Sequence, residues 1–303
     1  MISRASMAAF AVLACALVAV AAGCGGGGKK STSTTTSTST TSGGANPTIA
    51  AMVPAKYKSK GSLTVASDAT YAPDEFIASN GKTVVGMDPD LGAALGKVMG
   101  LKVNFVNATF DTIIPGLSSG KYDLGMSSFT DTKAREKVVD FVTYFTAGMS
   151  IYTKASGGTT LTNAMSMCGH SVAAETGTTE ADFATAQSGT CTKAGKPAVT
   201  VHTYPDQNAT NLAVASGRAD VGMADSPVAA YIVKQSAGKF KLTGPTLQSA
   251  PYGIAVPKNS GLTKPILAAL KELMSNGTYT TILQKWGIQQ GAITNPTING
   301  AIS

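Results

Sequence analysis

The sequence has little charge and few histidines, and both absences exclude functions. Only 14% of its 303 residues are charged, and its two histidines, His170 and His202, lie far apart in the sequence. A histidine-based metal centre needs several ligands at close spacing, which this chain does not offer. The net charge of +7 does not indicate nucleic acid binding, because no basic run exceeds two residues. We therefore expect no metal, no cofactor and no nucleic acid partner.

Long apolar runs are also scarce. Met7 to Ala22 is a run of sixteen residues without a charge, which is short for a membrane span of about 20 residues. It follows Arg4 and leads to "AAGC", which resembles the end of a bacterial lipoprotein signal. We expect residues 1–24 to be a signal peptide and Cys24 to carry a lipid at the new N-terminus. An uncleaved anchor helix is the alternative, and it would also hold the protein at the membrane.

Residues 25–58 begin with a Gly, Ser and Thr tract that offers little to bury. Such composition behaves as a flexible chain, so we expect a tether over residues 25–58.

The sequence contains four cysteines. Cys15 would leave with the signal peptide and Cys24 would carry the lipid, so Cys168 and Cys191 remain. An even pair in an exported protein predicts one disulfide bond.

From Ser62 onward, short apolar runs alternate with segments of helical period, which predicts an α/β fold. "SLTVAS" (62–67) and "LKVNFV" (101–106) are typical of strands. The helical segments are indicated by apolar residues three and four positions apart. They comprise Leu91, Ala94, Leu95 and Val98, then Ile266, Ala269, Leu270 and Leu273, then Tyr279, Ile282, Leu283 and Trp286.

An internal similarity indicates two lobes of related construction. "SSGKYDLGMSS" (118–128) and "ASGRADVGMAD" (215–225) share a pattern that predicts a helix end turning through glycine into a strand. Ser128 and Asp225 occupy equivalent positions at the ends of these repeats. A donor on one lobe and a carboxylate on the other would suit a zwitterion, because strand ends meet at a cleft.

The order of six motifs identifies a family. They are "ATYAPDEF", "VVGMDPDLGAALGKVMGL", "FDTIIPGLSSGKYDLGMSSFTDTKAREKVVDF", "GTTEADF", "SGRADVGMADSPVAAYIV" and "SNGTYTTILQKWG". Together they resemble the family 3 extracellular solute-binding proteins, the amino acid receptors of ABC importers. The resemblance implies a two-lobed periplasmic-binding-protein fold of type II with two crossover hinge strands. It places lobe one at 59–150 and 251–289, lobe two at 151–250, and a C-terminal tail at 290–303.

The resemblance also implies how a ligand α-carboxylate is bound. Arg135 would grip it, with further donors from Ser128 and Thr130. Thr179 would offer a backbone N–H from lobe two, at the start of a helix where Thr179 and Asp182 have capping-box spacing. Arg135 has one alternative role, which is to pair with a neighbouring carboxylate on a solvated helix face.

The other end of the ligand would meet acidic and aromatic residues. Asp225 matches the carboxylate that receives the α-ammonium, and Tyr71 and Phe110 match the aromatic walls. Asp68 matches the acidic residue that meets the ligand side chain. Each residue also has a purely structural alternative. Asp225 could cap a helix and Asp68 could cap a turn. Tyr71 and Phe110 could belong to the core.

Two positions depart from the family pattern. Asp74 stands where an aromatic residue is usual, and Glu175 stands where Lys, Leu or Gln is common. If Glu175 points inward, the side-chain end of the pocket becomes more acidic. With Asp68 present, acidic ligands are disfavoured, and we expect a polar or basic amino acid.

These expectations combine into one functional hypothesis with two alternatives. The protein would be a monomeric, lipid-anchored, extracytoplasmic receptor that closes on a free amino acid and docks on ABC permease subunits. The first alternative is a dehydratase-type enzyme on the same scaffold, with Glu175 or Asp74 as general acid. The second is a sensor or adhesion module that uses the fold without transport.

Overall fold

The computed structural model describes residues 44–302. The predicted signal peptide, Cys24 and the first part of the predicted tether lie outside the described residues. Within residues 44–302, no helix is both long and apolar enough to cross a membrane.

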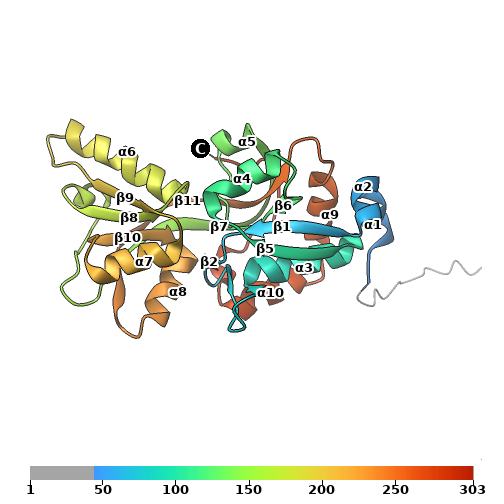
Figure 1. Ribbon diagram of the computed structural model, residues 1–303, viewed down its shortest axis with the longest axis horizontal. Helices are drawn as coiled ribbons and strands as arrows, with labels where there is room; N and C mark the ends of the chain where they lie inside the picture. Colours follow the sequence, from blue (N-terminus) through green and yellow to red (C-terminus); the bar gives the residue numbers. More distant parts are fainter. Residues whose placement is uncertain (1–43, 303) are drawn as a thin grey trace, which may run out of the picture. The chain divides into compact units, whose positions relative to one another are not determined.

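Helices and strands alternate along the chain, and the strands form two sheets (Figure 1). The smaller sheet has the order β2 (Thr70–Tyr71), β3 (Glu75–Ile77), β4 (Val84–Val85). The larger sheet has eight strands in the order β5 (Lys102–Asn107), β1 (Ser62–Ser67), β6 (Leu124–Gly125), β11 (Phe240–Pro257), β7 (Val139–Lys154), β10 (Val221–Asp225), β8 (Ser171–Glu175), β9 (Thr200–Tyr204).

Two long antiparallel strands, β7 and β11, join the two halves of the larger sheet. On one side β11 pairs with β6, which belongs with the parallel strands β1 and β5. On the other side β7 pairs with β10, which belongs with the parallel strands β8 and β9. We call the first group lobe one and the second lobe two; they lie at opposite ends of Figure 1. The predicted α/β fold with two crossover strands is confirmed, and the lobe boundaries at residues 150 and 251 stay a prediction.

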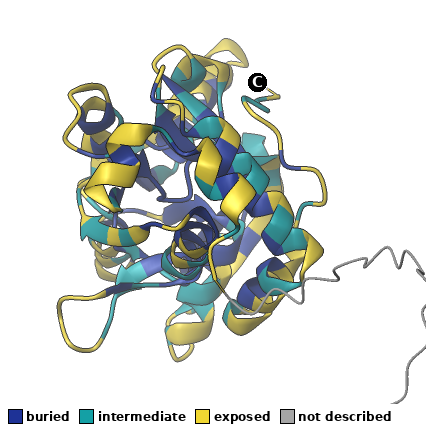
Figure 2. Cartoon of the chain, turned by 90° about the vertical axis from the view of Figure 1, so that its right-hand side faces the viewer, coloured by how far each residue is buried: buried dark blue, intermediate teal, exposed yellow. Residues whose placement is uncertain are grey.

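Alternation along the strands gives each lobe an apolar layer on both faces of its sheet. In lobe one, Leu63 and Val65 of β1 face a core shared with α3 (Met87–Met99), α9 (Thr263–Ser275) and α10 (Thr278–Trp286). Ala66 faces the opposite core, which contains Ile113 of α4 (Phe110–Ser118). The three predicted helical segments correspond to α3, α9 and α10. Figure 2 shows exposed residues on the outer helix surfaces of this lobe and buried residues behind them.

Lobe two is layered in the same way. Val172 and Val221 pack with Ala184 of α6 (Thr179–Lys193) on one face of the sheet. The other face is covered by α7 (Gln207–Ser216) and α8 (Ser226–Gln235), which bury Ala213 and Val228. The sheet is therefore buried on both sides, which explains the apolar strands of the sequence.

The internal repeat has the predicted helix, turn and strand. Helix α4 leads to Gly120 and β6, and helix α7 leads to Gly217 and β10. Both glycines have positive φ, 76° and 75°, a conformation that residues with a Cβ rarely adopt. The two repeats deliver Ser128 and Asp225 to the same region of the molecule, as described below.

The predicted tether is too long at its C-terminal end. Residues within 44–58 form α1 (Pro47–Met52) and the start of α2 (Ala55–Lys60). Asn46 caps α1 by accepting from the backbone N–H groups of Thr48 and Ile49. Ile49, Val53 and Tyr57 are buried in the lobe one core, and this apolar burial holds the segment against the domain.

The predicted C-terminal tail packs on lobe one. A 3-10 turn, η2 (Gln289–Gly291), precedes it. The Thr143 N–H donates to the Thr297 carbonyl at 2.9 Å, and the Gly300 N–H donates to the Asp131 carboxylate at 2.7 Å. These contacts fix the end of the chain beside β7.

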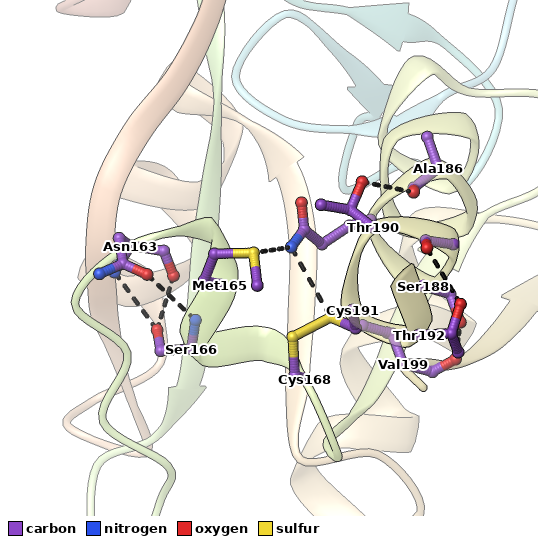
Figure 3. The surroundings of a disulfide bond; sticks show 12 residues. Asn163, Met165, Ser166, Cys168, Ala186, Ser188, Thr190, Cys191, Thr192 and Val199 are labelled. Carbon is purple, nitrogen blue, oxygen red and sulfur yellow. Dashed lines mark hydrogen bonds between the residues drawn. A yellow bond between two sulfur atoms is a disulfide. The ribbon is translucent and has the colours of Figure 1, made fainter. Parts of the chain in front are cut away.

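The predicted disulfide is present in lobe two (Figure 3). Cys168 follows the 3-10 turn η1 (Ala164–Met167), and Cys191 lies near the end of α6. The bond closes a loop with a sequence separation of 23, and Cys191 is fully buried in the lobe two core. It therefore ties α6 to the segment that leads into β8.

Replacing both cysteines by alanine is expected to lower the free energy of unfolding by about 3 kcal/mol, because the open loop gives the unfolded chain more entropy. Urea denaturation of the wild-type protein and the double variant measures the difference. Equal unfolding midpoints would contradict this account.

Candidate functional site

A cavity between the two lobes is lined by residues that the sequence placed far apart. The cavity is narrow: its volume is about 10 Å³, which is room for about one water molecule. All nine predicted ligand residues lie here, although their role as ligand contacts stays a prediction. The cavity is lined by Asp68, Tyr71, Phe110, Ser127, Ser128, Thr130, Arg135, Glu175, Thr178, Thr179, Glu180 and Asp225.

The topology of the sheet explains this convergence. Asp68 directly follows β1, Glu175 is the last residue of β8, and Asp225 is the last residue of β10. Ser128 lies three residues after the end of β6. Because these parallel strands end at the cleft, their carboxyl ends deliver polar side chains to one place.

Arg135 is aimed into the site by α5 (Lys133–Glu136), whose N-cap is Thr132. Its guanidinium donates to the Thr130 carbonyl at 2.8 Å and to the Gly177 carbonyl at 2.9 Å. Its central carbon lies 5.4 Å from the centroid of the Phe110 ring, a cation–π arrangement. Burial lowers the pKa of Arg135, and the nearby Glu180 carboxylate opposes that change.

Arg135 does not pair with a neighbouring carboxylate. Among the ion pairs of residues 44–302, Glu136 pairs with Lys133 at 3.0 Å and none includes Arg135. A guanidinium has five N–H donors. Two of these donors bind the carbonyl groups of Thr130 and Gly177, so the other donors remain for an anion.

Asp225 contacts lobe one through Tyr71. The Tyr71 hydroxyl donates to Asp225 Oδ2 at 3.1 Å and accepts from the Asp225 backbone N–H at 2.8 Å. Asp225 stands at the N-cap position of α8, but its side chain does not bond the helix. Burial raises the pKa of Asp225 well above its usual value, and Glu180 acts in the same direction.

Asp68 and Glu175 form the acidic end of the cavity. Asp68 accepts from the Thr70 hydroxyl at 2.7 Å and from the Phe110 backbone N–H at 3.1 Å, so it also holds the local turn. Glu175 faces the cavity, and its Oε1 is buried without a hydrogen-bond partner. Burial raises the pKa of Glu175 to about 10, with the Asp68 charge as the next cause.

One prediction about the site was wrong in detail, and the position of Asp74, which the sequence left open, is now defined. The N-cap of α6 is Thr178, whose hydroxyl accepts from the Ala181 N–H at 3.3 Å, so Thr179 is already the first helical residue. The residue three positions after Thr178 is Ala181, whose side chain has no acceptor, so the expected capping box is absent from this helix. Asp74 does not line the cavity, because it is fully buried behind Ser128.

Sequence reasoning missed three lining residues, Ser127, Thr178 and Glu180. Glu180 is the most informative, since it is only 2% exposed and its Oε1 has no partner. A signal for it existed: it follows Thr179 in the first turn of α6, where side chains lie near the helix end that faces the cleft.

Several hydrogen bonds cross the cleft besides the one between Tyr71 and Asp225. The hydroxyl oxygens of Thr130 and Thr179 are 3.3 Å apart. The contact from Arg135 to the Gly177 carbonyl also joins the lobes. The structure thus has a closed cleft, in which residues of both lobes line the cavity.

The comparisons with known proteins identify the family. The family model described as bacterial extracellular solute-binding proteins, family 3, matches residues 63–289. This chain belongs to that family. It is 34% identical over 254 residues to an arginine-binding protein of Corynebacterium glutamicum, covering 84% of this chain and 83% of the relative. It is 31% identical to an L-arginine-binding protein of Pseudomonas aeruginosa, covering 79% and 90%.

Solved structures show the same relationship. An ancestral arginine-binding protein bound to arginine has a TM-score of 0.68 and 37% identity, covering 75% of this chain and 98% of its own. An ancestral amino acid-binding protein described as a precursor of cyclohexadienyl dehydratase has a TM-score of 0.66 and 34% identity, covering 76% and 97%.

The pKa of Glu175 leads to a prediction about stability. Because the folded pKa of about 10 exceeds the usual value of 4.5, the unfolded chain releases this proton first as pH rises. The contribution of Glu175 to the free energy of unfolding is therefore fully present below pH 4.5. It decreases as the pH rises toward 10, by at most about 1.4 kcal/mol per pH unit. Glu175→Gln should flatten this decline in thermal denaturation between pH 5 and 9. Parallel wild-type and variant profiles would contradict it.

Proposed function

We propose that this protein is the extracytoplasmic amino acid-binding component of an ABC importer and that its ligand is a cationic amino acid such as arginine. One observation carries the choice of ligand class. Four buried or nearly buried carboxyl groups, those of Asp68, Glu175, Glu180 and Asp225, line a cavity that contains a single guanidinium.

The charges of the cavity match the groups of such a ligand. Arg135 would bind the α-carboxylate, with Thr130 and the backbone of Thr179 beside it. Asp225 would bind the α-ammonium. Asp68 and Glu175 then remain for a positive side chain, and their ionised forms become favourable once that charge is present. An acidic ligand would add like charge to a buried acidic surface.

Lobe closure would follow from the distribution of these groups. Arg135 belongs to lobe one and Asp225 to lobe two, so a zwitterion contacts both lobes at once. The ligand therefore stabilises the closed form by the extra contacts that only this form provides. The cavity as it stands is too small for an amino acid, so the ligand must enter while the lobes are apart and the lobes must close around it less tightly than here.

The setting proposed for this receptor rests on family membership and on the N-terminal sequence. Permease subunits of the importer would recognise the closed form. Lipidation at Cys24 and the Gly, Ser and Thr tract would keep the monomeric domain near the membrane on the outer side.

Neutral glutamine is the second candidate ligand. An ancestral arginine-binding protein bound to glutamine has a TM-score of 0.69 and 36% identity to this chain. In this chain Glu175 holds a proton over a wide pH range, and its O–H would donate to an amide oxygen. A glutamine complex would therefore leave Glu175 protonated, whereas an arginine complex would ionise it.

One observation supports a dehydratase-type activity. Glu175 lines the cavity with a raised pKa, so it holds a proton that it could donate as a general acid. Asp74 is excluded from that role because it does not reach the cavity. Incubation with cyclohexadienyl acids and analysis for aromatic products separates this activity from binding alone.

A thermal-shift screen against the common amino acids tests the proposed ligand. At one hundred times its dissociation constant, a ligand adds about 2.7 kcal/mol to stability, which gives a clear shift. We expect the largest shift with arginine or another cationic amino acid. A shift with glutamine alone would overturn the cationic assignment, and no shift with any amino acid would overturn the receptor function.

Arg135→Ala is expected to weaken amino acid binding by roughly thirtyfold to several thousandfold, or about 2 to 5 kcal/mol, because the ligand carboxylate loses its partner in a desolvated site. Isothermal titration calorimetry measures the change. Lys133→Ala is the matched control, because Lys133 lies on the same short helix and pairs only with Glu136 at the surface. Unchanged affinity of Arg135→Ala would contradict the assigned site.

A further inference from the structure

A second group of carboxyl residues lies behind the ligand cavity. Asp74 and Glu75 stand at the start of β3, and Asp88 lies in the first turn of α3. All three are 0% exposed. None of them lines the cavity, so the proposed binding mechanism does not use them.

Hydrogen bonds connect this carboxyl cluster to the wall of the cavity. Ser128 donates its backbone N–H to Asp88 at 3.2 Å, and its hydroxyl lies 3.0 Å from Asp74 and 3.3 Å from Glu75. Ser127 donates its hydroxyl to Glu75 at 3.1 Å.

The same Ser127 hydroxyl accepts the backbone N–H of Asp68 at 2.8 Å. The cluster therefore supports Ser128 directly and Asp68 through Ser127. Both supported residues belong to the ligand cavity.

Counting hydrogens favours a proton within the cluster. The Ser128 hydroxyl has one hydrogen and contacts a carboxyl oxygen of both Asp74 and Glu75. It can donate to only one of them. The other contact is satisfied when that carboxyl group is protonated and donates to Ser128 Oγ.

Among residues 44–302, no positive charge acts on these three carboxyl groups. The groups that act on the cluster are Asp225 and the phenols of Tyr144 and Tyr252. The Tyr144 hydroxyl and one oxygen each of Asp74 and Asp88 are buried without a partner. No group of acidic, histidine or cysteine side chains within residues 44–302 has the arrangement of a metal site. Protons are therefore the remaining means of neutralising the cluster.

Ser128 also needs this support for its backbone. Its φ is +49°, a left-handed conformation that is uncommon for residues other than glycine. Such a conformation persists where surrounding contacts determine it. The bonds to Asp74, Glu75 and Asp88 supply those contacts.

We propose that Asp74, Glu75 and Asp88 form a proton-holding cluster whose hydrogen bonds position Ser128 and Asp68 for ligand binding. The effect on affinity rests on the proposed amino acid-binding function, whereas the protonation itself does not. Burial raises the pKa of Asp74 and of Glu75 well above their usual values, and that of Asp88 to about 6. Asp88 is thus the member that ionises first, at the N-terminal end of α3 where a negative charge is favourable.

Carboxyl-carbon NMR titration of the full protein tests the protonation. Carbon-13 labelling of Asp and Glu side chains, with Asp74→Asn, Glu75→Gln and Asp88→Asn for assignment, follows each residue between pH 4 and 9. We expect Asp74 and Glu75 to remain protonated at pH 7. Midpoints for all three groups near their usual values, about 4, would overturn the proposal.

Affinity for L-arginine tests the positioning role. Asp74→Asn is uncharged and keeps a donor and an acceptor, so its dissociation constant should stay within about threefold of wild type. Asp74→Ala removes the contact to Ser128 and should weaken binding by about tenfold or more. Asp90→Asn is the control, because Asp90 lies on α3 two residues from Asp88 but accepts from Lys285 and Trp286, and it should leave affinity unchanged.

The outcomes separate this proposal from the proposed function. Equal losses in Asp74→Asn and Asp74→Ala would show that the charge of Asp74 is needed and would overturn the proton-holding cluster. Wild-type affinity in Asp74→Ala would overturn the positioning role. If the wild-type protein does not bind arginine, the ligand assignment fails, and the NMR titration still decides the protonation. It also decides the matter if Asp74→Ala does not fold.

Discussion

The burial of four carboxyl groups opposite a single guanidinium is the constraint on which the rest of the site depends. Taking an ionised carboxylate out of water is costly unless it gains a partner or a proton. In this protein Glu175 and Asp225 respond with strongly raised pKa values, and Glu180 does so to a lesser degree. Without ligand, protonation of these carboxyl groups allows the cleft to close. A cationic ligand would instead pair with them in their ionised form.

The chain topology, and not the local sequence, brings the carboxyl groups and the guanidinium together. β7 and β11 carry the chain between lobes, so that strand ends from both lobes meet at one cleft. Ser128 and Asp225, at equivalent positions of the internal repeat, thus reach opposite sides of the same cavity. The proposed proton-holding cluster of Asp74, Glu75 and Asp88 then supports one wall from behind, outside the cavity.

Much of this was predictable from the sequence. Helical spacing located α3, α9 and α10, and motif order located all nine predicted cavity residues. The rest depended on tertiary contacts. The helices at residues 47–60 are stabilised because Ile49, Val53 and Tyr57 pack into the lobe one core. This core is built from residues far away in the sequence, so local sequence does not predict the packing. The sequence left open whether Asp74 faces the cleft. Its place behind Ser128 depends on a contact between segments 54 residues apart, which no local pattern reveals.

The central claim is that the ligand supplies the positive charge that this cavity lacks, and proton release measures it most directly. L-arginine is titrated into the protein at pH 7 by calorimetry, in phosphate and in Tris, which differ in ionisation heat. Because Glu175, with a pKa of about 10, holds a proton before binding, the account predicts release of about one proton, seen as buffer-dependent enthalpy. Arginine binding with the same enthalpy in both buffers would contradict it.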